Sequence, residues 1–117
     1  MQRGSVVIVS ARGDYGKPRP ALVVQDTRMQ RIVGSVTVCL LTTDLIEEPG
    51  TLRVNIAPSK ENGPRERSQV QVEKLMTFPC EKVRGPIGRI DPTQMNAVDI
   101  GLLVHLGLAT QLGVAAR

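Results

Sequence analysis

The dipeptide Asp91-Pro92 divides this chain into a long part rich in short apolar segments and a short helical part. Aspartate is a preferred N-cap residue, proline suits the first helical position, and Gln94, three residues after the cap, can complete a capping box. Apolar side chains then recur at helical spacing at Met95, Val98, Leu102, Leu103 and Leu106. The sequence predicts one amphipathic helix from Pro92 to Leu108, whose apolar stripe covers a sheet or, as a less favoured alternative, a dimer interface.

Six short segments before this boundary have the composition of β-strands, because valine, leucine and isoleucine fill them and glycine, proline and charged residues separate them. They are Ser5–Ser10, Ala21–Gln25, Ser35–Leu41, Leu52–Ile56, Gln69–Leu75 and Pro86–Ile90. Five or six strands and one helix fit an α+β, mainly β fold, a small SH3-like barrel of strongly bent antiparallel strands with a C-terminal helix. At 117 residues we expect one domain over residues 1–110 and a tail over 111–117.

The charge balance favours a polyanionic partner. Fifteen basic residues against eleven acidic ones give a net charge of +4 and a pI near 9.6. Cys39 lies in an apolar run and Cys80 is distant in sequence, so we expect two reduced thiols. No apolar stretch approaches the roughly 18 residues of a membrane span, and we expect a cytoplasmic protein.

The familiar catalytic groupings are missing from the sequence. His105 is the single histidine, which excludes a histidine pair for acid–base catalysis. One histidine and two cysteines are too few for a metal site of those ligands, and no glycine-rich nucleotide motif is present. We therefore expect no metal and no cofactor, and a reaction carried by arginine, threonine and carboxylate side chains.

Polar candidates stand at the ends of three predicted strands: Arg19 at the second, Thr42 and Thr43 at the third, and Glu73 on the fifth. A bent sheet could bring them together. A guanidinium can bind a phosphate through two N–H groups and a hydroxyl can donate another bond, so Arg19 with Thr42 could stabilise the charge of a phosphorane. Residue types alone favour the simpler interpretation, a solvated strand-end cation at Arg19 and a threonine that caps a turn at Thr42.

Five segments in the same order resemble the MazF/PemK toxin endoribonucleases of bacterial toxin–antitoxin systems. They are Arg3-Gly4 with the first valine-rich strand, Arg19-Pro20-Ala21-Leu22-Val23-Val24, Val38-Cys39-Leu40-Leu41-Thr42-Thr43, Ser68-Gln69-Val70-Gln71-Val72-Glu73-Lys74-Leu75, and Ile87-Gly88-Arg89-Ile90. The resemblance implies a homodimer that cuts single-stranded RNA without a metal, by attack of the ribose 2′-hydroxyl, leaving a 2′,3′-cyclic phosphate and a 5′-hydroxyl. It also implies an acidic, partly disordered antitoxin that blocks the RNA groove.

The same resemblance assigns roles to individual residues. Arg19 and Thr42 correspond to the catalytic pair, and Glu73 is the candidate for proton transfer. Some members have an arginine at the position of Gln71, so this chain keeps the carboxyl of Glu73 but lacks that cation.

RNA contacts are expected from Arg12, Tyr15, Lys17, Thr43 and Gln71. Tyr15 could stack on an unpaired base or pack on the first hairpin. Two other functions fit the scaffold: a non-cleaving toxin or binding protein, such as a topoisomerase poison or an RNA-binding module, and a degenerate toxin with a structural role. For the non-cleaving protein the C-terminal helix would matter more than Arg19.

Overall fold

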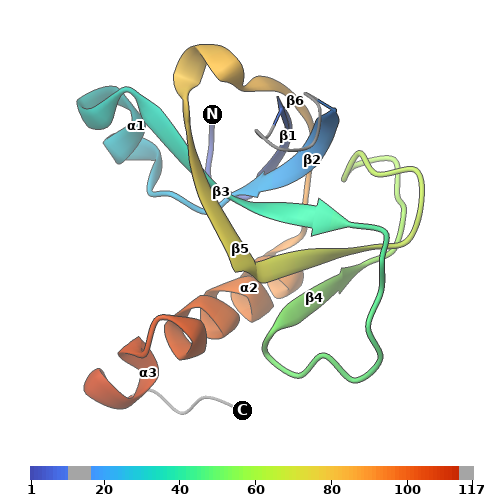
Figure 1. Ribbon diagram of the computed structural model, residues 1–117, viewed down its shortest axis with the longest axis vertical. Coiled ribbons are helices and arrows are strands. Elements are labelled where there is room, and N and C mark those ends of the chain that lie inside the picture. Colours follow the sequence, from blue (N-terminus) through green and yellow to red (C-terminus); the bar gives the residue numbers. More distant parts are fainter. Residues whose placement is uncertain (11–16, 114–117) are drawn as a thin grey trace.

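The computed structural model describes residues 1–10 and 17–113 as a curled six-stranded antiparallel sheet with helices at its margins (Figure 1). The strand order is β4-β5-β3-β2-β1-β6. The strands are β1 (Ser5–Ser10), β2 (Pro18–Val23), β3 (Ser35–Thr42), β4 (Arg53–Ile56), β5 (Ser68–Pro79) and β6 (Arg84–Arg89). The helices are α1 (Thr27–Val33), α2 (Pro92–His105) and α3 (Leu108–Gln111), with a 3₁₀ turn at Cys80–Lys82.

The sheet bends along its longest strand, β5, which pairs with both β3 and β4. β5 pairs with β3 from Ser35↔Pro79 to Thr42↔Gln69, and the register shifts between Cys39 and Leu41. Its first residues also pair with all of β4. A register shift of this kind bends a strand and increases its twist. The sheet is therefore most strongly bent where β5 pairs with β3.

Apolar clusters lie on both faces of the sheet. One contains Val7, Val9, Ala21, Val23, Val36, Val38, Leu40, Phe78 and Val83. The other contains Val6, Leu22, Val24, Cys39, Leu41, Ile56, Val70, Ile90 and Val98, and the last of these belongs to α2, which packs on β4 and β5 (Figure 1). Burial on both faces explains the unbroken apolar runs of the first three strands. Burial also raises the pKa of the Cys39 thiol to about 12, and the nearby charge of Glu73 adds to the effect.

The predicted start of α2 is confirmed. The Asp91 carboxylate accepts from the Gln94 backbone N–H at 2.7 Å, and the Asp91 N–H donates to the Gln94 side chain at 3.1 Å. The predicted end at Leu108 is wrong, because Gly107 adopts a left-handed conformation with φ 73° and separates α2 from α3.

α1 was not expected, since the sequence predicted one helix only. Asp26 caps it by accepting from the Arg28 N–H at 2.9 Å, and Gly34 ends it in the left-handed region at φ 68°. None of its seven residues is buried, so it carries no apolar stripe that a periodicity search could find.

The bounds of several strands also differ from expectation, most of all those of β2 and β5. β2 begins at Pro18 and ends at Val23, because the N–H groups of Val24 and Gln25 both turn toward the Thr37 carbonyl, at 3.2 and 3.4 Å. β5 continues past Leu75 to Pro79 through its pairing with the start of β3. None of the helices within residues 1–10 and 17–113 is long and apolar enough to cross a membrane.

Candidate active site

The ends of β2 and β3 bring Arg19 and Thr42 into one cavity. The two strands pair antiparallel from Val23↔Val38 to Ala21↔Leu40, so the start of β2, which carries Arg19, and the end of β3, which carries Thr42, lie on the same side of the sheet. The cavity has a volume of about 140 Å³ and is lined by Arg19, Pro20, Leu41, Thr42, Thr43 and Ser68. The expected meeting of the second and third strand ends is therefore present, while the catalytic role of these residues stays a prediction.

The backbone two residues after Thr42 orients the Thr42 hydroxyl. Its Oγ1 accepts from the Asp44 N–H at 3.0 Å. A threonine hydroxyl has one proton to donate and two lone pairs, so this bond leaves the proton of Thr42 available to an acceptor in the cavity.

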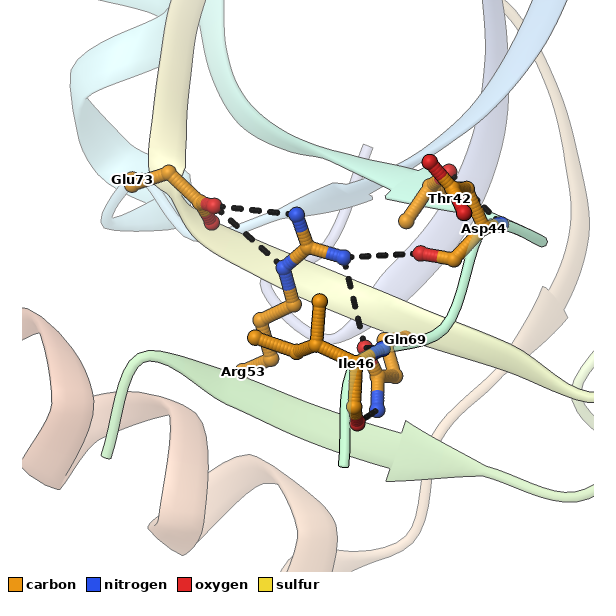
Figure 2. Close-up of polar contacts among 6 residues, drawn as sticks. All are labelled: Thr42, Asp44, Ile46, Arg53, Gln69 and Glu73. Carbon is orange, nitrogen blue, oxygen red and sulfur yellow. Dashed lines mark hydrogen bonds and ion pairs between the residues drawn. The ribbon is translucent and has the colours of Figure 1, made fainter. Parts of the chain in front are cut away.

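Glu73 does not line this cavity but lies on β5, where it is paired with Arg53 of β4 (Figure 2). The Arg53 Nε and Nη2 donate to Glu73 Oε2 at 3.3 and 3.2 Å. The two side chains are only 13% and 22% exposed. The other oxygen, Oε1, is buried and accepts no hydrogen bond from the described part of the chain.

Arg53 was not singled out by the sequence analysis, although it supplies the cation that seemed to be missing. It stands directly opposite Gln71 in the β4–β5 register. Glu73 thus has a guanidinium beside it from the neighbouring strand, although position 71 of its own strand carries an uncharged amide. Only the pairing of β4 with β5 reveals this, since no sequence signal links positions 53 and 73.

Gln69 anchors the segment between β3 and β4. Its Oε1 accepts from the Ile46 N–H at 3.1 Å and from Arg53 Nη1 at 3.3 Å. Its Nε2 donates to the Ile46 carbonyl and to Asn55 Oδ1, both at 2.9 Å. Polar residues that alternate along a strand are typical of a face open to water, but Gln69 is 2% exposed and Gln71 is 8% exposed.

The expected RNA contacts are distributed unevenly around the cavity. Thr43 lines it and is exposed, and Lys17 is exposed immediately before β2. Gln71 lies in the first part of β5, opposite Arg53. Arg12 and Tyr15 lie outside the described residues.

Metal-ligand side chains do not cluster in the described residues. Within the ranges 1–10 and 17–113, no three histidine, cysteine or acidic side chains lie close enough together to hold a metal ion. Cys39 and Cys80 are both free thiols, the first buried and the second exposed.

The sequence matches the family model of the PemK-like, MazF-like toxin of type II toxin–antitoxin systems over residues 2–106. It is also 39% identical over 110 residues to a protein of Mycolicibacterium smegmatis named "Probable endoribonuclease MazF", covering 93% of this chain and 99% of that protein. The chain belongs to this family. The resemblance drawn from the five segments is thereby confirmed, as is the class of enzyme, at the level of the PemK/MazF toxin family.

Solved structures of PemK/MazF toxins confirm the fold. An endoribonuclease in complex with its cognate antitoxin from a mycobacterial species matches with a TM-score of 0.75 at 23% identity, over 92% of this chain and 96% of that one. The Mycobacterium tuberculosis toxin MazF-mt6 matches with a TM-score of 0.75 at 21% identity, over 89% and 97%. A MazE–MazF complex from Deinococcus radiodurans gives 0.73 at 16% identity, over 92% and 96%. The small, strongly bent antiparallel sheet with a C-terminal helix is the architecture of these toxins.

The Arg3-Gly4 segment of the resemblance has a structural place outside the cavity. Arg3 donates from Nε to the Val24 carbonyl at 2.9 Å and forms an ion pair with Asp99 of α2. This segment therefore ties the N-terminus to the end of β2 and to α2, away from Thr42.

Proposed function

We propose that this PemK/MazF-family chain is a toxin endoribonuclease that cleaves single-stranded mRNA without a metal ion. The observation that carries the proposal is the meeting of Arg19 and Thr42 across adjacent strands in one small cavity. A cation and a hydroxyl donor at one point suit a phosphodiester, whose two nonbridging oxygens take up charge when a fifth oxygen adds to phosphorus.

In the proposed reaction the ribose 2′-oxygen attacks the adjacent phosphorus while its proton is removed. Arg19 and Thr42 donate hydrogen bonds to the nonbridging oxygens as the phosphorane forms. The bond from phosphorus to the 5′-oxygen then breaks, and that oxygen takes a proton from solvent water. The products are a 2′,3′-cyclic phosphate and a 5′-hydroxyl.

Glu73 is the proposed acceptor of the 2′-hydroxyl proton. A carboxylate suits this task better than a guanidinium, which stays protonated near neutral pH. Glu73 uses only Oε2 in its ion pair with Arg53, and Oε1 has no donor within residues 1–10 and 17–113.

Partners follow from the family and the charge. We propose a cytoplasmic homodimer inhibited by an acidic antitoxin, because a chain of net charge +4 attracts an acidic segment. Matching structures include an endoribonuclease with its cognate antitoxin and MazE–MazF complexes.

The test is incubation of the purified protein with a long single-stranded RNA in EDTA, followed by mapping of the cut sites and end groups. We expect cleavage with cyclic phosphate ends, and a loss of roughly 100-fold or more in Arg19→Ala and Thr42→Ala. Both variants should keep the thermal melt of the parent protein. Full cleavage by Arg19→Ala would refute the mechanism.

Toxicity that survives Arg19→Ala but disappears when the end of α2 is altered would instead identify a non-cleaving toxin.

A further inference from the structure

One guanidinium connects the strand that carries Glu73 with the segment that follows Thr42. Arg53 uses its Nε and Nη2 for Glu73, and its Nη1 donates to the Asp44 carbonyl at 2.9 Å (Figure 2). The N–H of the same Asp44 donates to Thr42 Oγ1. Glu73 and Thr42 are therefore linked through Arg53 and a single residue of backbone.

We propose that Arg53 is the positioning residue of the cleavage site, which sets both the carboxylate of Glu73 and the hydroxyl of Thr42. This inference rests on the proposed ribonuclease function and adds to it a residue that does not line the cavity. Arg53 acts through these two groups and does not itself contact the phosphate.

The arrangement requires the planar fork of arginine. The three acceptors, Glu73 Oε2, the Asp44 carbonyl and Gln69 Oε1, lie in different directions around one guanidinium. A lysine ammonium is a point charge without the two fixed edges of a guanidinium. It can keep the attraction to Glu73, but it cannot bind the Glu73 carboxylate and the Asp44 carbonyl at the same time in a fixed geometry.

Burial makes this cation hold its partners tightly. The Arg53 side chain is 13% exposed, and the buried Gln69 amide packs beside it and accepts from Nη1. At such a largely buried site few water molecules compete for charge-assisted hydrogen bonds. These bonds therefore fix the orientation of the side chains. A different ion pair, Arg28–Asp26 at the N-terminus of α1, has side chains 86% and 48% exposed. It provides a matched control.

The experiment compares Arg53→Met, Arg53→Lys and Arg28→Met in single-turnover RNA cleavage. For Arg53→Met we expect the cleavage rate to fall about 100-fold, which is the loss typical when catalytic groups are displaced by about 1 Å. We expect KM to change less than about threefold, because substrate binding does not involve Arg53. Arg53→Lys should recover only a small part of the rate, and Arg28→Met should match the parent protein. In a further variant, Arg53→Ala, added guanidinium at millimolar concentration should raise the cleavage rate. Parental rates in Arg53→Met would overturn the proposal.

A double-mutant cycle with Glu73→Gln separates positioning from a general structural role. If Arg53 acts through Glu73, the double variant should be little slower than the slower single variant, because the two losses share one cause. Fully multiplicative losses would overturn the link to Glu73.

A second measurement does not depend on cleavage. ¹⁵N relaxation of Asp44 and Ile46 should report rigid backbone in the parent protein, with order parameters near about 0.85, falling below about 0.6 in Arg53→Met. If the parent protein does not cleave RNA, the proposed function fails while this measurement still decides on positioning. Unchanged order parameters in Arg53→Met would refute the positioning role whatever the activity.

Discussion

Arg19 and Thr42 reach the same cavity because each stands at the end of a strand that is buried on both faces. The β2–β3 register leaves little freedom there, since Ala21, Leu22 and Val23 are fully buried. A side chain at the end of such a strand is directed by the packing of the residues before it. Strand-end polar residues in this sequence were thus good candidates, and the structure brings three of the four, Arg19, Thr42 and Thr43, to one cavity.

Gln69 is the residue on which we place a prediction for stability. Gln69→Leu removes an amide that bonds to Ile46, Asn55 and Arg53. We expect the free energy of unfolding to fall by about 1–3 kcal/mol, because the largely buried Arg53 guanidinium loses an acceptor. Ile46 and Asn55 are exposed enough to regain water and add little to the loss.

Chemical denaturation measures this loss, and exposed Gln111→Leu serves as its control, with an expected change below about 0.5 kcal/mol. A Gln69→Leu protein as stable as the control would show that the network contributes no net stability.

At the scale of elements, helix α2 packs against β4 and so fixes the position of the strand that carries Arg53. Gly101 lies where α2 passes the residues leading into β4. A Cβ added there would come within 2.5 Å of the Thr51 carbonyl oxygen and 3.0 Å of Val72. The close approach of α2 to the sheet therefore requires a glycine.

Gly101→Ala is expected to destabilise the protein although alanine is the better helix former. The gain in helix propensity is about 1 kcal/mol. The clash is with a backbone oxygen that cannot move alone, and overpacking of this kind costs about 1–3 kcal/mol. The second effect should win, lowering the thermal midpoint, whereas Asn96→Ala on the exposed side of α2 should leave it nearly unchanged. A rise in the midpoint for Gly101→Ala would contradict the packing argument.

The two helices illustrate what local sequence can and cannot reveal. α2 was predicted from its cap and its apolar stripe, both of which are local. α1 has a cap at Asp26 and a glycine at 34, but it buries no side chain, so nothing distinguished it from a polar connection. Its stability comes from its ends and from its attachment to β3.

At the scale of the whole molecule, the net charge of +4 predicts a measurable salt dependence of RNA binding. With an RNA that carries deoxyribose at the cut site, the logarithm of the affinity should fall linearly with the logarithm of salt concentration. Each phosphate contact contributes a slope of about −0.7 for a single strand. Lys17→Ala should make the slope shallower by about 0.7, and Arg28→Ala should leave it unchanged. An identical slope for Lys17→Ala would remove Lys17 from the RNA path.

The sequence by itself determined the aliphatic strands, the start of α2 and the strand-end residues Arg19 and Thr42, because these depend on local patterns of capping and burial. Only the tertiary structure decided that Arg53 faces Gln71 and pairs with Glu73, and that Gln69 holds Ile46. Those contacts join residues about twenty positions apart through the register of β4 on β5. Register is set by how the whole sheet curls around its two cores, so no local pattern in this chain could specify it.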